Sequence, residues 1–266
     1  MPTISVITIS YCAASHIRKT IESVLAQTYT DYEYVFVDGG SGDDTVAIME
    51  SYRQQFEAKG ICYQVKSEPD QGIYDAMNKG IDRASGQWVL MLNAGDCLAD
   101  ENVLQDIFEG KTYDEEVLYG DTLQHSGSYL RFAQAQSAQL LTEHMPFCHQ
   151  STFVKAETLR RFRFDTAYAI CADYDLFVRL YRSGVAFRRL SRTVSVYSMD
   201  GVSETRAAKV FSEYEMAKKS NGLVTGGGRQ LAFLRYMASV WKQRIMRTWF
   251  PSRFYHPDRG WKRVNE

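Results

Sequence analysis

Apolar residues in the first half of the chain form short runs separated by segments of helical periodicity. Continuous apolar runs, typical of buried strands, occur at residues 4–10, 34–37, 61–65 and 88–92. Apolar residues at three- and four-residue spacing predict helices at residues 17–27, 44–58 and 73–84, and Ser15 is placed to cap the first of them. This alternation is typical of an α/β protein whose mostly parallel sheet is flanked by helices.

The second half of the chain has a looser pattern. A helix is expected at residues 100–108 and a strand at 117–122, and His125-Ser126-Gly127-Ser128 predicts a hairpin or flap. A further strand is expected at residues 152–154 and a helix at 174–182. No repeat or low-complexity segment interrupts the chain.

Composition narrows the class of protein. The 266 residues are 45% apolar and carry a formal charge of −1, so there is no global reason to expect a nucleic-acid partner. Five well-separated cysteines without a CxxC pair indicate reduced thiols rather than a disulfide framework or a zinc site. No basic and apolar leader precedes Ile4, and no apolar stretch reaches the length of a membrane span. We therefore expect a cytoplasmic protein.

Positive charge is concentrated at the C-terminus. Residues 229–266 contain nine lysines and arginines and two acids, a net charge of +7. Apolar residues recur there at helical spacing, at Leu231, Leu234, Ala238, Trp241, Ile245 and Trp249. A basic amphipathic helix with tryptophans predicts binding to an anionic membrane surface. The alternative is a helix that packs its apolar stripe on the preceding domain. The glycines at 222 and 226–228 place the boundary between a domain of residues 1–221 and a helical extension of residues 222–266.

The most informative segment is SEPDQGIYDAMNKGIDRASGQWVLMLNAGD, residues 67–96. In it, an acidic turn leads into a helix, and a strand then ends in Asn93-Ala94-Gly95-Asp96. In open α/β sheets, ligands bind at the carboxyl ends of the strands. A carboxylate placed there is poorly explained by packing, although a loop cap is the simpler alternative. Asp96 is therefore a candidate site residue.

This segment resembles the signature of family 2 glycosyltransferases, which have the GT-A fold. More narrowly, EPDQGIYDAMNKGI at 68–81 and LNAGD at 92–96 are similar to the branch that contains colanic acid biosynthesis glycosyltransferases. The resemblance extends to VFVDGGS at 35–41, to His149-Gln150 and to Asp173-Tyr174-Asp175, and covers residues 3–205. Several ordered motifs at such spacing are far more specific than one alone. The resemblance implies a Rossmann-like GT-A domain.

The sequence lacks the motifs of two other classes of nucleotide-binding protein. After the first strand, the residues 10–15 contain no glycine that would let a dinucleotide pyrophosphate approach, and no Walker lysine is present. A nucleotidyltransferase would need a glycine-rich basic loop at the same place. If a nucleotide binds, a divalent cation held by carboxylates is the expected way to bind its phosphates.

The resemblance implies transfer of a sugar from a nucleotide diphosphate sugar to a saccharide acceptor of bacterial surface polysaccharide, the acceptor being lipid-linked at the cytoplasmic membrane face. Mg²⁺ or Mn²⁺ held by Asp96 would stabilise charge on the leaving diphosphate. The broader family has Asp-x-Asp here, whereas this chain has Asn93 and Gly95 before Asp96. This difference motivates the alternative of a non-catalytic sugar-nucleotide-binding or scaffold protein.

By the same resemblance, Asp173 is the general base of an inverting reaction. Asp175 is expected to brace the start of the helix, where acids favour the helix dipole, and that dipole is also the simpler explanation of Asp173. His149-Gln150 would bind acceptor or diphosphate, or form a buried polar pair that supports the site.

Other residues are expected to bind substrate. Asp38 and Gly39 would contact the nucleotide, although a turn residue that bonds its own backbone is the alternative for Asp38. Met77 replaces an arginine of the broader family, a loss that Lys79 could offset. A late loop, Gly201-Val202-Ser203, would close over the donor. The complete predicted set is Ile9, Ser10, Tyr11, Asp38, Gly39, Asp70, Gly72, Tyr74, Asp75, Asn78, Asn93, His149 and Gln150.

Overall fold

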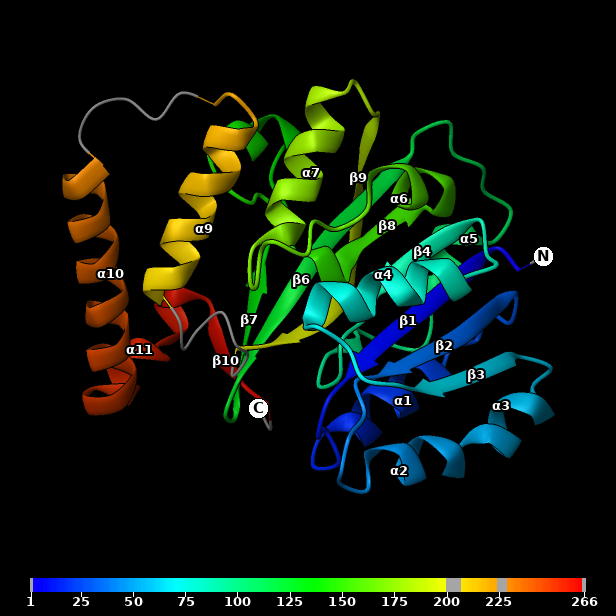
Figure 1. Cartoon of the computed structure of the whole chain (residues 1–266). Coiled ribbons are helices and arrows are strands. Elements are labelled where there is room, and N and C mark those ends of the chain that lie inside the picture. The colour runs from blue at the N-terminus through cyan, green and yellow to red at the C-terminus, as the bar shows by residue number, and fades with distance from the viewer. Residues whose placement is uncertain (1, 200–206, 224–228, 265–266) are drawn as a thin grey trace.

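The computed structural model describes residues 2–199, 207–223 and 229–264 and shows one twisted sheet with helices on both faces (Figure 1). The strand order is β10-β7-β6-β8-β4-β1-β2-β3, with β9 beside β6 and β5 beside β9. The strands are β1 Ile4–Ser10, β2 Tyr32–Asp38, β3 Cys62–Ser67, β4 Trp88–Met91, β5 Cys97–Leu98, β6 Val117–Ser126, β7 Tyr129–Ala133, β8 Thr152–Lys155, β9 Phe187–Ser198 and β10 Trp261–Arg263.

The helices connect and cover these strands. They are α1 Ile17–Leu25, α2 Thr45–Ser51, α3 Arg53–Ala58, α4 Ile73–Arg83, α5 Val103–Phe108, α6 Ala156–Phe162, α7 Ala172–Arg182, α9 Ala207–Ser220, α10 Arg229–Trp249 and α11 Pro251–Phe254. Short 3₁₀ turns are η1 Ala138–Thr142, η2 His149–Ser151 and η3 Pro257–Arg259. The α/β fold class predicted from the sequence is confirmed.

The centre of the sheet has apolar residues on both faces. Side chains alternate along β1, so that Ile7 packs in the cluster that includes α4 and α7, while Val6 packs in the cluster that includes α1, α2 and α5. Gly80 lets α4 lie directly on β1, because a Cβ there would come within 2.6 Å of the Ile7 side chain. Burial on both faces explains why the sequence shows continuous apolar runs at these strands.

Strands β1 to β4 are parallel, as the alternating pattern predicts, whereas the second half of the sheet is mixed. Strand β8 runs antiparallel to β4 and to β6, and β9 runs parallel to β6. The expected hairpin at 125–128 is confirmed as the turn between β6 and β7. The sequence pattern loosens where the sheet changes to mixed pairing, because these strands are not joined by regular strand–helix units.

Three local predictions were wrong. Helix α1 begins after His16 without a side-chain cap, and Ser15 instead bonds the His16 ring. The expected single helix at 44–58 breaks at Tyr52, where backbone bonds shorten to i→i+3. The helix expected from residue 100 begins at Val103, because the Asp100 side chain accepts a bond from the Asn102 backbone and forms a turn.

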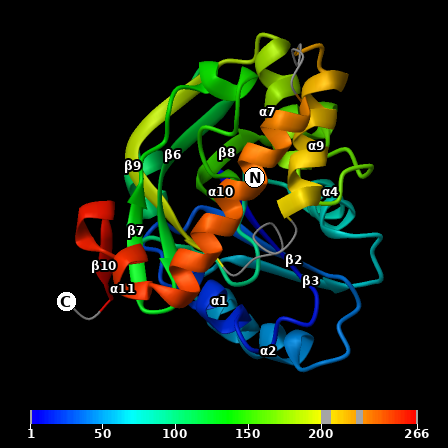
Figure 2. The same cartoon turned by 90° about the vertical axis from the view of Figure 1, so that its left-hand side faces the viewer.

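The C-terminal extension returns to the sheet. After α10 and α11, strand β10 pairs antiparallel with β7 and extends the sheet edge, an element that the sequence did not predict (Figure 2). The helix predicted there is confirmed as α10. Leu234, Trp241 and Trp249 of its apolar stripe are exposed, which contradicts the packing alternative. None of the described helices is both long enough and apolar enough to cross a membrane.

Candidate active site

A cleft of about 860 Å³ lies at the carboxyl ends of β1 and β4. Such an edge is the usual ligand site of open α/β sheets. Eleven of the fifteen residues predicted for the site line it, namely Ile9, Ser10, Tyr11, Asp70, Gly72, Tyr74, Asn93, Asp96, His149, Gln150 and Asp173. The structure therefore brings together side chains that lie up to 164 positions apart in the sequence.

The turn between Asn93 and Asp96 is held tightly on its neighbours. Gly95 has φ +99°, a conformation that favours glycine, and its N–H donates to Thr20 Oγ1 at 2.8 Å. A Cβ on Gly95 would lie 3.0 Å from the His16 ring, which packs over this turn. These contacts fix the direction in which the Asp96 side chain points.

Asp96 is almost completely buried at the floor of the cleft. Its Oδ2 accepts a bond from Gln150 Nε2 at 3.0 Å, and its Oδ1 accepts one from the Ser198 backbone N–H at 3.0 Å. Burial raises the pKa of this carboxyl, while these two bonds and the charge of Lys19 act in the opposite direction. A carboxylate desolvated in this way gains strongly from a nearby cation, so the site favours a positively charged ligand.

A hydrogen-bonded chain joins the Asn93 turn to Asp173. The His149 Nδ1 lies 3.1 Å from Asp173 Oδ2, and the His149 Nε2 lies 3.3 Å from Asn93 Nδ2. With the Asn93 amide in this orientation Nδ2 donates, so that Nε2 accepts and Nδ1 carries the proton. His149 thus orients the Asp173 carboxylate. Gln150 bonds Asp96, so this pair supports both carboxylates of the cleft.

The Asn93 side-chain oxygen is the one buried side-chain acceptor in the described chain that has no hydrogen-bond partner. A buried unsatisfied oxygen requires an explanation, and a bound cation supplies one. Oxygen atoms of an amide and a carboxylate suit Mg²⁺ or Mn²⁺, which commonly take only one or two protein ligands beside substrate phosphates. Within the described residues, no cluster of three or more His, Cys, Asp and Glu could hold a metal alone. Asn93 and Asp96 therefore fit a metal shared with a phosphorylated ligand.

Asp173 lies in the first turn of α7 and points into the cleft. Its Oδ1 accepts a bond from its neighbour's backbone N–H, Tyr174 N, at 2.9 Å and lies 3.3 Å from the Tyr74 hydroxyl. The Tyr74 hydroxyl also donates to the carbonyl of Ile170. Burial, and then the Asp173 charge, raise the pKa of Tyr74 well above 10, so Tyr74 stays a neutral donor. Asp173 is thus a carboxylate held by several donors at the cleft wall.

The loop before α7 is held by a residue that the motifs did not indicate. Glu213, on α9, accepts backbone N–H bonds from Ala169 at 3.0 Å, Ile170 at 2.8 Å and Cys171 at 3.0 Å. The carboxylate is buried, and Lys209 is its ion-pair partner, at 3.8 Å. No sequence pattern marks Glu213, because it acts on a segment 42 to 44 residues away.

Asp38 is buried behind the cleft rather than on its wall. Its carboxylate accepts bonds from the hydroxyls of Ser10, Ser41 and Ser67 and from the backbone of Gly40 and Ser41. Burial acts to raise the pKa of Asp38, but these bonds, from Ser41 first, outweigh it and the pKa lies below 3.8. This geometry favours the turn-bonding alternative, and a nucleotide contact stays a prediction.

Gly39 also lies off the cleft, but it makes room for a residue that lines it. A Cβ on Gly39 would come within 2.3 Å of Asp70 Oδ2. Asp70 in turn accepts a bond from the Gly72 N–H at 2.8 Å. The absence of a side chain at Gly39 therefore allows the Asp70 carboxylate to reach the cleft wall.

Two predicted substrate-binding residues of α4 do not line the cleft. Asn78 bonds the backbone N–H and carbonyl of Phe164 at 3.1 and 2.9 Å, so it joins α4 to the loop before α7. Asp75 accepts a bond from Gln71 N and pairs with Lys79 at 3.1 Å, beside a smaller pocket. Lys79 also donates to the Pro69 carbonyl and is not a cleft residue, so it does not replace the lost arginine.

The cleft contains further residues outside the motifs. Lys19 and His16 enter it from the start of α1, and Met145, Phe147 and Tyr197 form an apolar wall. Lys19 lies in the first turn of the helix that follows β1, and this position at a strand–helix junction is the signal that would have found it. Burial, and then the charge of Lys19, lower the pKa of His16. The predicted loop 201–203 lies outside the described residues.

Comparisons with known proteins identify the family of this chain. The model of the family described as Glycosyl transferase family 2 matches residues 5–178. A protein of Mycobacterium bovis (strain BCG / Pasteur 1173P2) named PGL/p-HBAD biosynthesis glycosyltransferase is 30% identical over 215 residues, which cover 79% of this chain and 82% of that protein. A Bacillus subtilis (strain 168) protein named for teichuronic acid biosynthesis, the glycosyltransferase TuaG, is 37% identical over 95 residues, 36% of each chain.

Solved structures show the same fold. The S. aureus TarS 1-349 structure in complex with UDP-GlcNAc has a TM-score of 0.66 at 16% identity, covering 93% of this chain and 73% of that chain. The mannosyltransferase PcManGT from Pyrobaculum calidifontis, in complex with GDP-Man and Mn²⁺, has a TM-score of 0.61 at 15% identity, covering 90% and 70%. The narrower likeness to colanic acid enzymes stays a prediction. By the family match and these relatives, the chain belongs to glycosyl transferase family 2 and is a GT-A glycosyltransferase with relatives in cell-surface glycan biosynthesis.

Proposed function

We propose that this enzyme transfers one sugar from a nucleotide diphosphate sugar to a saccharide acceptor of a bacterial surface polysaccharide, with inversion at the anomeric carbon. The observation that carries the proposal is the chain of contacts from Asn93 through His149 to Asp173, in a cleft that also holds Asp96. This arrangement supports a base and a cation site on opposite sides of one histidine.

In this proposal Asp173 accepts the proton of the acceptor hydroxyl. The hydroxyl oxygen forms a bond to the anomeric carbon as the bond from that carbon to the diphosphate oxygen breaks. Attack from the face opposite the diphosphate inverts the configuration. His149 holds the carboxylate through Nδ1–H at 3.1 Å, so the base is oriented before the acceptor binds.

Asn93 and Asp96 would hold a divalent cation, Mg²⁺ or Mn²⁺. When bound, such an ion stabilises negative charge on the departing diphosphate. Lys19 enters the same part of the cleft and adds a fixed positive charge. The solved PcManGT structure contains GDP-Man with Mn²⁺, and the TarS structure contains UDP-GlcNAc, which supports a metal and a nucleotide sugar here.

The donor is tested by thermal unfolding with UDP, GDP and dTDP, each with and without Mn²⁺. At a hundred times the dissociation constant, a ligand adds about 2.7 kcal/mol of stability, which is readily measured. A metal-dependent shift with one base is the expected result. No shift with any nucleotide, in folded protein, would favour the scaffold alternative for this chain.

The base is tested by Asp173→Asn. General base catalysis contributes about 10²–10⁴-fold, so sugar transfer should fall by that factor while the nucleotide-dependent thermal shift is retained. Asp82→Asn is the matched control, because that carboxylate is exposed on α4 and pairs with Arg163 on the surface. Full transfer by Asp173→Asn would show that another group removes the proton.

We further propose that the acceptor is lipid-linked and that the enzyme works at the cytoplasmic face of the membrane. The absence of acidic residues from 229 to 257, where six lysines and arginines occur, supports a negatively charged surface as the partner of the extension.

A further inference from the structure

The outer face of α10 carries a stripe of exposed apolar side chains. Leu234 is 63% exposed, Trp241 68% and Trp249 75%. These positions, together with the exposed Ala238 between them, recur at the spacing of one helix face. Phe250, directly after the helix, is also exposed. Single exposed apolar residues are ordinary, whereas a continuous stripe with two tryptophans indicates an interaction surface.

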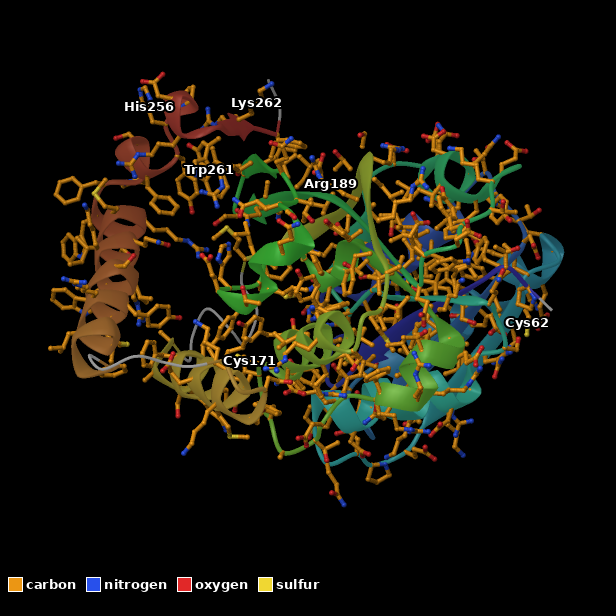
Figure 3. The ribbon with its side chains drawn as sticks, turned by 90° about the horizontal axis from the view of Figure 1, so that it is seen from above. Cys62, Cys171, Arg189, His256, Trp261 and Lys262 are labelled. Atoms are coloured by element: carbon orange, nitrogen blue, oxygen red, sulfur yellow. The ribbon has the colours of Figure 1, made fainter. Side chains whose placement is uncertain are left out.

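The opposite face of α10 holds the helix on the rest of the protein. Phe233 and Tyr236 pack their rings against Phe211 of α9, with centroids 5.2 and 5.5 Å apart. Further along, Met246 packs on the cluster that contains Phe254 and Trp261. Figure 3 shows α10 at the outer edge of the molecule, with Trp261 on its inner side. The helix is therefore anchored by one face, and the stripe is a second, separate surface.

Positive charges flank the stripe. Arg235, Lys242 and Arg244 are exposed on α10 itself. The first acid after residue 229 is Asp258. Tryptophan and leucine interleaved with lysine and arginine are typical of helices that lie in a lipid headgroup layer. This charge pattern also opposes pairing of the stripe with a second copy of itself, since both faces would be strongly positive.

We infer that α10 is a membrane-docking helix that lies flat on an anionic lipid bilayer, inserting Leu234, Trp241 and Trp249 between the headgroups. With 21 residues it is about 31 Å long, enough for several lipids along its length. The docking itself is independent of the reaction. Its use in catalysis rests on the proposed function, because it would bring the enzyme to a lipid-linked acceptor.

The inner side of α10, opposite the stripe, contacts a cluster of side chains that reaches the cleft wall. Tyr197, a cleft residue, packs on the same cluster of Met199, Phe254 and Trp261 that Met246 of α10 contacts. Helix α10 is therefore joined to the cleft wall through packed side chains, and the stripe faces away from them.

Tryptophan fluorescence of the full chain tests the docking directly. The chain has four tryptophans, of which Trp88 and Trp261 are 3% and 2% exposed, whereas Trp241 and Trp249 are exposed and both lie on α10. A change of emission on adding vesicles therefore reports on α10. We expect a blue shift with phosphatidylcholine vesicles containing about 30% phosphatidylglycerol, and quenching when their acyl chains are brominated. Vesicles of phosphatidylcholine alone, or about 0.5 M salt, should weaken binding at least roughly tenfold.

Variants separate insertion from charge alone. Trp241→Ser combined with Trp249→Ser should reduce sedimentation with the anionic vesicles at least roughly tenfold. Met216→Ser on α9, an exposed apolar residue outside the stripe, should leave it unchanged. Equal sedimentation of the double variant and the wild type would overturn the inference. A blue shift of tryptophan emission that appears without vesicles as the protein concentration rises, together with a dimer in light scattering, would also overturn the inference.

The two proposals fail separately. The nucleotide-dependent thermal shift of the double variant should equal that of the wild type, because both tryptophans lie outside the cleft. Vesicle binding without any nucleotide shift would refute the proposed donor chemistry and leave the docking intact. A nucleotide-dependent thermal shift without vesicle binding would refute the docking and leave the proposed donor chemistry intact.

Discussion

Replacing Glu213 by glutamine tests whether helix α9 fixes the loop that leads to the proposed base. The Oε1 of Glu213 accepts the N–H of Ala169, and Oε2 accepts those of Ile170 and Cys171. Glutamine keeps the shape of the side chain but has only one acceptor oxygen. At least one backbone N–H must then face an amide NH₂ group, in a place where water has little access.

The expected loss of folding stability in Glu213→Gln follows from these hydrogen bonds. An unsatisfied buried donor costs about 1–3 kcal/mol, and bonds to a charged acceptor are stronger than those to a neutral one, so we expect a loss of about 3 kcal/mol. For a chain of 266 residues the unfolding entropy is about 0.56 kcal/mol/K, so the melting temperature should fall by about 5 °C. Calorimetry or thermal fluorescence measures this shift.

Activity supplies a readout that general destabilisation would not move. Tyr74 donates to the Ile170 carbonyl, and Asp173 follows three residues later, so a displaced loop misplaces the base. At a temperature where Glu213→Gln is fully folded, kcat should fall between about 10- and 100-fold, with little change in the donor KM.

The control for Glu213→Gln is Lys209→Ala. This lysine is exposed and lies 3.8 Å from Glu213, so its removal should shift the melting temperature by less than about 1 °C and leave kcat unchanged. The reasoning is refuted if Glu213→Gln melts and turns over like the wild type.

Three further predictions concern other parts of the fold. The pKa of Asp38 is lowered in the folded state, so the stability advantage of wild type over Asp38→Asn should be full above pH 3.8 and should decline as the pH falls through the folded pKa. Urea unfolding midpoints of the two proteins, measured between about pH 6 and 3, test this. A difference between the midpoints that stays constant over this range would contradict it. Gly86→Ala should destabilise the folded protein by about 1–3 kcal/mol, because the new Cβ would lie 2.6 Å from the backbone nitrogen of Ser5. Gly42→Ala should leave the stability unchanged, since the space around Gly42 is open. Equal urea midpoints for the two variants would refute the clash at Gly86. Lys19→Ala should raise the donor KM roughly tenfold, and a KM that stays unchanged would show that this ammonium does not contact the diphosphate.

The core of the fold was predictable because its signals are local. Burial on both faces makes β1, β2 and β4 apolar over most of their length, and α4 shows its buried side at helical spacing. The turn that ends in Asp96 follows a strand directly, so its place at the sheet edge could be inferred without a structure. The spacing of Leu234, Trp241 and Trp249 likewise predicted the helix that carries them.

Other parts depended on contacts between distant segments. The sequence does not show that serines from three separate segments donate hydrogen bonds to Asp38. Nor does it show that the Asn78 side chain is hydrogen-bonded to the backbone of Phe164. A polar side chain near a motif can bind a ligand or hold a loop, and only its partners decide which. Strand β10 was missed for a related reason, since three residues have no periodicity to detect.

What the sequence by itself determined is the order of strands and helices in the first half, the edge where the cleft forms, and the amphipathic character of α10. Each follows from short-range periodicity and from residue types at the ends of elements. Only the tertiary structure decided which carboxylates face the cleft, that Glu213 clamps the loop before Asp173, and that the stripe of α10 is exposed instead of packed. These depend on which surfaces meet when the chain closes on itself, and the same residues in another arrangement would have other neighbours.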